Sequence, residues 1–305
     1  MSSTQEYLFR VAGFGIRIHL PKIWDVSMLL PSFRPFLHEK CNGDNVLINC
    51  VVQPVLDVPL INHQGILIDE TVNDMGSIRL FRNLNEYRVV LSCESHRYTH
   101  VMMASRNFSE IHIQLCHEDK TAGRMLSSLL RIAYSQAILY HASLSVHASA
   151  VYVDNCGFLF LGKSGTGKST HSSLWMKYIP ETRLLNDDNP TVRIINGMAY
   201  VWGTPWSGKT PCYEDRFYPV RGMVRLNQAS ENRFSFKEGA DAFVTLFPGC
   251  SAICQDEDLR LMLYDTVASL AEMVPVGVLD CRPDKEAAIL CHRALCDVNV
   301  TMRNQ

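Results

Sequence analysis

The chain has 305 residues, of which 47% are apolar and 20% are charged, a composition typical of a globular protein. Its formal charge of -2 excludes bulk electrostatic attraction to nucleic acid or to an anionic membrane, so we expect neither as a partner. The N-terminus lacks the pattern of a secretory signal, and no apolar stretch reaches the about 18 residues of a membrane span. The 11 cysteines lack C-x-x-C spacing and are typical of buried thiols in a reducing compartment, so a cytoplasmic location is expected.

Residues 1–120 are predicted to form a β-rich N-terminal unit, mainly antiparallel, because short apolar or alternating runs are separated by turn residues. The expected strands are 14–20, 46–52, 79–81, 87–91, 100–103 and 111–115. Four of the histidines in this region form a loose cluster in the sequence, at His96, His100, His112 and His117. Strand alternation with surface exposure explains them better than a metal site.

A linking helix is predicted within residues 121–144, where apolar side chains recur at spacings of three and four. The remaining segment, 145–305, is predicted to be a nucleotide-binding domain. Its expected strands are 149–153, 157–161, 191–195, 198–202 and 276–281, and its expected helices are 171–178, 256–273 and 284–295. The overall class is α/β (α+β).

The pattern G-x-x-x-x-G-K-[ST] occurs at residues 162–169, directly after the apolar strand 157–161 and before a helix. Glycines allow backbone N–H groups to converge on phosphate oxygens, and the helix adds its N-terminal donors. We call residues 162–169 the phosphate loop. Its predicted nucleotide-binding residues, with the residue that follows, are Gly162, Lys163, Ser164, Gly165, Thr166, Gly167, Lys168, Ser169 and Thr170. Lys168 is expected to reach the β and γ phosphates, and Ser169 to offer its hydroxyl to Mg²⁺.

The same pattern occurs a second time, at Gly203–Thr210. Pro211 and a charged stretch follow it without helical periodicity, so it is predicted not to be a phosphate loop. Lys209 from this segment remains a candidate for contact with phosphate or substrate.

Two adjacent carboxylates, Asp187 and Asp188, follow the phosphate loop by about 20 residues. One would suffice to anchor Mg²⁺ together with phosphate oxygens and Ser169, and the other would be free to accept a proton from an attacking hydroxyl. The alternative is a polar turn before Pro190, since Asn-Asp-Asp-Asn is rich in turn formers. The spacing in sequence from the phosphate loop favours the metal-binding and proton-accepting role over the turn.

The phosphate loop, with His147-Ala148-Ser149-Ala150-Val151 before it and Asn186-Asp187-Asp188 after it, resembles the catalytic domain of HPr kinase/phosphorylase. The loop with an Asp-Asp pair is also similar to that of ATP-dependent phosphoenolpyruvate carboxykinase. These families share a mixed-sheet P-loop fold, and the resemblance covers residues 145–296. Ala148 stands where the kinase family has glycine, and the N-terminal half does not resemble that family.

The resemblance implies ATP and Mg²⁺ as cofactors and makes a homo-oligomer plausible. It implies that Ser169 and one of Asp187 and Asp188 bind the metal while the other aspartate acts as a general base, and that His147 lies near the phosphates. A half-buried position at a strand end is the alternative for His147. Arg221 and Arg225 are candidate phosphate or substrate contacts, with surface or salt-bridge roles as their alternatives.

The sequence therefore predicts a phosphotransferase that moves the γ-phosphoryl group of ATP to a hydroxyl of a protein, peptide or small molecule. A non-enzymatic nucleotide sensor or scaffold is the first alternative. A P-loop ATPase of the motor or transport type is the second, and it would require a parallel sheet.

Overall fold

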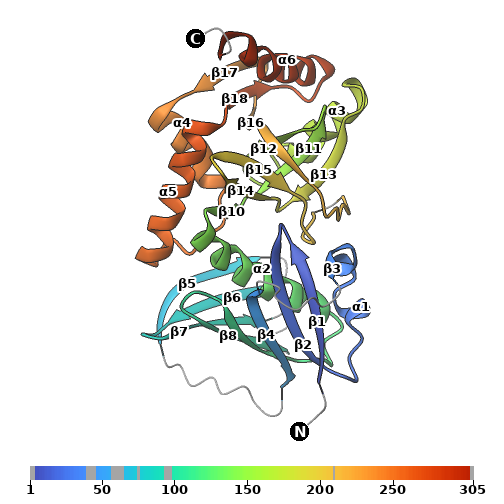
Figure 1. The fold of residues 1–305 in the computed structure, drawn as a ribbon, viewed down its shortest axis with the longest axis vertical. Helices are drawn as coiled ribbons and strands as arrows, with labels where there is room; N and C mark the ends of the chain where they lie inside the picture. Colours follow the sequence, from blue (N-terminus) through green and yellow to red (C-terminus); the bar gives the residue numbers. More distant parts are fainter. Residues whose placement is uncertain are drawn as a thin grey trace. The chain divides into compact units, whose positions relative to one another are not determined.

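The computed structural model describes residues 4–38, 46–55, 65–73, 76–92, 98–208 and 210–302. The chain divides into two compact units: unit 1 comprises Met1–Tyr140 with Ile253–Asp256, and unit 2 comprises His141–Ala252 with Glu257–Gln305. By these contacts most of the segment predicted as a linking helix, 121–144, belongs to unit 1. Each unit contains one large mixed sheet and few helices (Figure 1).

Unit 1 is built on a sheet with the strand order β3-β1-β2-β4-β9-β8-β7-β6-β5. Neighbouring strands pair antiparallel except β2 with β4 and β4 with β9, which are parallel. Its elements are β1 (Thr4–Val11), β2 (Phe14–Pro21), α1 (Val26–Leu29), η1 (Pro31–Phe36), β3 (Leu37–His38), β4 (Val46–Pro54), β5 (Ile66–Asn73), β6 (Gly76–Arg82), β7 (Glu86–Ser92), β8 (Thr99–Ser105), β9 (Glu110–Leu115), α2 (Ala122–Ala137) and η2 (Ile138–His141).

Helix α2 packs on this sheet against β4, β8 and β9. Its buried side chains Met125, Leu126, Leu129, Leu130 and Ala133 follow the predicted helical spacing. Burial of this apolar stripe is the main contribution that the helix makes to the free energy of folding.

The four histidines at 96, 100, 112 and 117 do not share one site among the described residues. His100 is fully buried and its Nε2 lies 3.0 Å from a carboxylate oxygen of Asp119. His112 is exposed on β9, and the ring of His117 stacks on Trp24 at 4.8 Å. His96 lies outside the described residues. Within the described part of the chain, no group of three or more His, Cys, Asp or Glu side chains could hold a metal ion.

Unit 2 contains a sheet with the order β10-β14-β15-β16-β12-β11-β13. In addition, β18 pairs with β16, and β17 pairs with β18. β12 is parallel to β16 and antiparallel to β11, so the sheet is mixed around the phosphate loop. Its elements are β10 (Ser143–Ser145), β11 (Ala148–Val153), β12 (Cys156–Leu161), α3 (Lys168–Tyr178), β13 (Arg183–Asp188), β14 (Thr191–Ile195), β15 (Met198–Trp202), β16 (Phe217–Gln228), β17 (Arg233–Lys237), α4 (Gly239–Leu246), η3 (Phe247–Gly249), α5 (Glu257–Met273), β18 (Val276–Cys281) and α6 (Lys285–Met302).

The main core of unit 2 lies between the sheet and helices α3 and α6. Trp175 of α3 is fully buried, and its ring centroid lies 5.1 Å from that of Phe160 on β12. Leu161, the next residue, points to the other face, where a Cβ on Gly249 would come within 2.7 Å of its side chain. Helix α3 thus covers one face of β12, and η3 covers the other.

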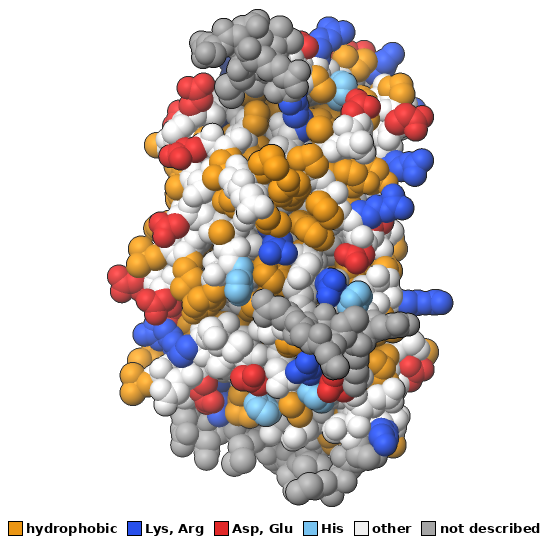
Figure 2. Space-filling model, in the orientation of Figure 1, with side chains coloured by type: hydrophobic (Ala, Val, Ile, Leu, Met, Phe, Trp, Pro, Cys, Tyr) orange, Lys and Arg blue, Asp and Glu red, His pale blue; other side chains and the backbone are white. Residues whose placement is uncertain are grey.

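Acidic and basic side chains are interspersed on the face drawn in Figure 2, in line with the formal charge of -2. Among the described helices, none combines the length and apolarity needed to cross a bilayer.

Candidate active site

The phosphate loop connects β12 to α3 through a tight turn. Gly165 and Gly167 have φ angles of 80° and 105°, which a side chain would strain. Gly167 caps α3 without a side-chain hydrogen bond, so the first turn of the helix keeps its backbone N–H groups available. Thr166 closes the turn by donating its backbone N–H and its hydroxyl to the carbonyl of Lys163. The strand, glycine loop and helix therefore follow in the predicted order.

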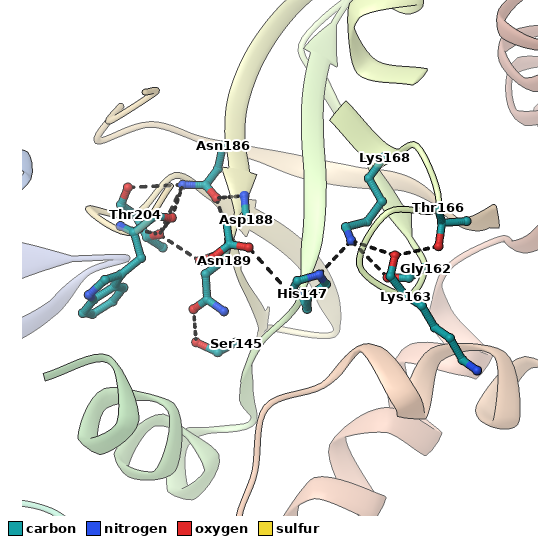
Figure 3. A network of polar contacts seen from close by, with 11 residues as sticks. Ser145, His147, Gly162, Lys163, Thr166, Lys168, Asn186, Asp188, Asn189 and Thr204 are labelled. Carbon is teal, nitrogen blue, oxygen red and sulfur yellow. Dashed lines mark hydrogen bonds and ion pairs between the residues drawn. The ribbon is translucent and has the colours of Figure 1, made fainter. Parts of the chain in front are cut away.

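Lys168 folds back over the loop that precedes it. Its Nζ donates to the carbonyls of Gly162 at 3.0 Å and Lys163 at 3.4 Å and lies 2.7 Å from Nε2 of His147 (Figure 3). Burial lowers the pKa of Lys168, and the charges of Asp188 and Asp187 partly oppose that shift.

His147 lies between this lysine and the carboxylate pair, by which we mean Asp187 and Asp188. A lysine ammonium only donates, so Nε2 of His147 accepts and the ring proton sits on Nδ1. Nδ1 is 3.6 Å from Oδ1 of Asp188. The backbone N–H of His147 donates to the carbonyl of Gly249, which fixes the residue just before β11. Lys168, His147 and Asp188 thus form a continuous chain of polar contacts (Figure 3).

The strand register explains why residues distant in sequence meet here. Ala148 pairs with Leu161 on one side and with Asp188 on the other. The end of β12, the start of β11 and the end of β13 therefore lie side by side at one end of the sheet. Ser149 pairs with Phe160 and with Asp187. Residues paired directly across strands project to the same face. Ser149 hydrogen bonds to Ser172 of α3 at 2.6 Å, so Asp187 projects toward the α3 face.

Asp187 and Asp188 differ in their surroundings. Asp187 is 5% exposed, and neither of its carboxylate oxygens has a hydrogen-bond partner among the described residues. Asp188 is 24% exposed and faces His147. A buried carboxylate without a donor is costly in a folded protein, and such atoms are concentrated where a ligand or ion binds.

The second glycine pattern has a different structure from the phosphate loop. The segment from Gly203 to Gly208 runs beside the end of β13, where Gly208 donates to the carbonyl of Asp187 and Ser207 forms a bridge with Asp188. The chain then continues through 211–216 to strand β16 without a helix. Lys209 lies outside the described residues.

The remaining predicted residues fall into two groups. Ser164, Ser169 and Thr170 are exposed on the phosphate loop and the first turn of α3, beside Lys168. Arg221 donates to the carbonyl of Cys296 on α6, and Arg225 donates through Nε and Nη2 to the carbonyl of Thr245 on α4. These two arginines hold helices against β16, and no contact brings them to the phosphate loop within the described structure.

Three residues of this region were not predicted as site residues. Gln228, at the end of β16, donates to the carbonyl of Gly165, and Gly249 anchors His147. Asn186 makes buried hydrogen bonds on both sides of the carboxylate pair. Only Asn186 carried a sequence signal, since it adjoins the two aspartates.

Comparisons with known proteins find little similarity. No protein-family model matches the chain, and a search of curated proteins finds no match. The solved structures that match include one of the Hpr(Ser) kinase/phosphatase from Coxiella burnetii, with 12% identity and a TM-score of 0.34 over 52% of this chain and 93% of that chain. At that level of similarity, fold family and activity have to be argued from the residues of this chain.

Proposed function

We propose that the protein is a phosphotransferase that moves the γ-phosphoryl group of ATP to a hydroxyl group. The observation that carries the proposal is the buried carboxylate of Asp187, which has no hydrogen-bond donor among the described residues and lies at the same end of the sheet as the phosphate loop. The contacts from Lys168 to His147 and from His147 to Asp188 connect the phosphate loop to the carboxylate pair. A loop for phosphates beside two carboxylates is the set of groups that phosphoryl transfer to a hydroxyl requires.

The residues present fit a divalent cation. Asp187 offers two oxygens that no described residue satisfies, and Ser169 offers a hydroxyl at the start of α3. Mg²⁺ prefers oxygen ligands and is usually held by one or two carboxylates together with phosphate oxygens. Asp187 and Ser169 would hold the ion, which would neutralise charge on the β and γ phosphates. Asp188 is the less suited ligand because it already faces His147.

In this assignment Asp188 accepts the proton of the acceptor hydroxyl. The hydroxyl oxygen forms a bond to the γ-phosphorus while the bond between that phosphorus and the β–γ bridging oxygen breaks. The electron pair of the broken bond leaves with ADP, and the proton moves to Asp188. Lys168 stabilises the developing negative charge on the transferred group. His147, whose Nδ1 proton faces Asp188, orients that carboxylate.

The acceptor is a hydroxyl of a protein or peptide serine or of a small molecule. The mixed sheet around β12 counts against an ATPase of the motor or transport type, in which the strands beside the loop run parallel.

The test uses the full chain with γ-labelled ATP, Mg²⁺, free serine and a mixture of serine-containing peptides. We expect label on a hydroxyl with the wild type and a loss of at least about 100-fold in rate with Asp188→Asn. Asp265→Asn, an exposed carboxylate of α5, is the matched control and should retain the wild-type rate. Equal rates for wild type and Asp188→Asn would refute the role of the base. Tight binding of Mg-ATP without transfer to any hydroxyl would favour a nucleotide sensor instead.

A further inference from the structure

The second glycine pattern, Gly203–Gly208, lies on the side of the carboxylate pair away from the phosphate loop. β13 is the edge strand of the sheet, with β11 on its inner side, and the 203–208 segment runs along its outer side. The close approach has a residue-level cause: a Cβ on Gly208 would come within 2.6 Å of the carbonyl oxygen of Asp187. Glycine at 208 therefore serves contact with β13 rather than with a phosphate.

The side chain of Asn186 joins this segment to the carboxylate turn. Its Oδ1 accepts the backbone N–H groups of Asp188 at 3.1 Å and Asn189 at 2.9 Å. Its Nδ2 donates to the carbonyl and hydroxyl of Thr204, both at 3.2 Å, and to the carbonyl of Trp206 at 3.1 Å. Asn186 is fully buried, so its amide is satisfied by protein groups on both sides.

Thr204 completes the connection. Its hydroxyl donates to the carbonyl of Asn189 at 2.8 Å and accepts from the backbone N–H of Trp206 at 3.3 Å. Asn189 in turn accepts from the hydroxyl of Ser145 through its side chain. Ser145 lies two residues before His147, so the same network reaches the histidine that contacts Lys168 (Figure 3).

We propose that Asn186 and Thr204 are positioning residues that hold the carboxylate pair in register with the phosphate loop, and that the 203–208 segment exists for this purpose. The inference rests on the proposed function, because it concerns the carboxylates assigned there to the cation and to the proton. Neither residue touches phosphate or acceptor. A fully satisfied buried network fixes one arrangement of the turn, whereas a partly satisfied one allows several. Displacing a reacting group by about 1 Å is enough to lower a rate by about 100-fold.

The experiment compares three threonine variants of the full chain. Thr204→Val keeps the shape and removes the hydroxyl, and Thr204→Ser keeps the hydroxyl. Thr266→Val is the matched control, because Thr266 is also buried in unit 2 and its hydroxyl donates to the carbonyl of Met262 on α5. For each variant we would measure the affinity for ATP with Mn²⁺, the affinity for ATP in EDTA, and the rate of phosphoryl transfer.

For Thr204→Val we expect the affinity in the presence of Mn²⁺ to fall about 10-fold, as for other changes to groups that orient a metal ligand. The affinity in EDTA should be unchanged, the rate should fall about 10-fold or more, and Thr204→Ser and Thr266→Val should behave like the wild type. Equal losses in Thr204→Val and Thr266→Val, or equal losses of affinity with Mn²⁺ and in EDTA, would overturn the inference. A wild type that binds but transfers nothing would refute the proposed function alone, since the ratio of the two affinities would still decide the positioning role.

Discussion

The carboxylate of Asp187 is the residue on which the proposed chemistry most depends. It is almost fully buried on β13 without a donor among the described residues, although the charge of Lys168 lies close enough to interact with it. Natural proteins retain such groups at functional sites at the expense of stability. We therefore expect the replacement of Asp187 to increase stability and to impair function.

We predict that Asp187→Asn raises the free energy of unfolding of the nucleotide-free protein by about 1 kcal/mol, because the carboxylate is buried without a hydrogen-bond donor from the described residues. The affinity for ATP with Mn²⁺ should fall at the same time. Chemical denaturation and nucleotide titration measure the two effects, with Asp265→Asn as the exposed control. A loss of stability in Asp187→Asn would mean that the folded protein already compensates this charge.

At the scale of elements, helix α3 contributes residues both to the candidate site and to the core of unit 2. Its first turn carries Lys168 and Ser169, whereas His171 and Trp175 face β12. His171 is 3% exposed, and its Nε2 accepts from the Nε1–H of Trp175 at 3.0 Å. Burial lowers the pKa of His171 to about 4. The helix therefore depends on a neutral histidine in its second turn.

This histidine predicts a pH dependence of stability. The ordinary pKa of 6.5 applies in the unfolded chain, so between pH 6.5 and 4 the unfolded state binds more protons than the folded state. Stability should thus fall as the pH drops through this window, by about 3 kcal/mol from His171 alone. We expect His171→Gln to be less stable than the wild type at pH 7 and to lose less on acidification. Parallel stability curves for the two proteins from pH 7 to 4 would contradict this.

Helix and strand boundaries were predicted well where the pattern was local. Strands 191–195, 198–202 and 276–281 coincide with β14, β15 and β18, and the helix expected at 256–273 differs from α5 by one residue. Asp154 and Asn155, between the expected strands 149–153 and 157–161, have φ angles of 50° and 57° in the hairpin between β11 and β12.

Elements were missed where neighbours in space supply the stability. β16 (Phe217–Gln228) lies between β12 and β18 in the centre of the sheet, yet its sequence includes Pro219 and Gly222. Gly222 is needed because a Cβ there would come within 2.6 Å of the side chain of Leu295 on α6. Strand β13 was not among the expected strands, because its pairing with β11 cannot be recognised in the local sequence pattern.

For the molecule as a whole, unit 1 includes a four-residue segment from the C-terminal half of the chain. Ile253–Asp256 belong to unit 1, where Asp256 is 1% exposed. Its Oδ2 accepts from Arg82 at 2.9 Å and Tyr87 at 2.5 Å and lies 3.0 Å from Nη2 of Arg106. Because Oδ2 is buried, removing its charge weakens the contacts that both arginines make with it.

We predict that Asp256→Asn destabilises unit 1 by about 3 kcal/mol. Hydrogen exchange followed by mass spectrometry should show faster exchange in peptides from β6, β7 and β8, with unit 2 unchanged, since units of a chain can open separately. Glu257→Gln, an exposed neighbour, is the control. Equal acceleration in both units would mean that the carboxylate stabilises the chain as one cooperative body.

The sequence by itself determined the order of strand, glycine loop and helix at 157–178 and most strands with a clear period, because each depends on residues close together in the chain. It also led to the choice of the loop at 162–169 over the pattern at 203–210, from the strand before it and the helix after it. The tertiary structure alone decided that Asp187 is buried without a donor from the described residues, while Asp188 faces His147. It also decided that the 203–208 segment lies against the carboxylates. These features depend on pairing between β11, β12 and β13 and on hydrogen bonds between residues 15 or more positions apart, such as that from Thr204 to Asn189. Residue spacing in the sequence does not determine such contacts, because they form only when the sheet brings its strands together.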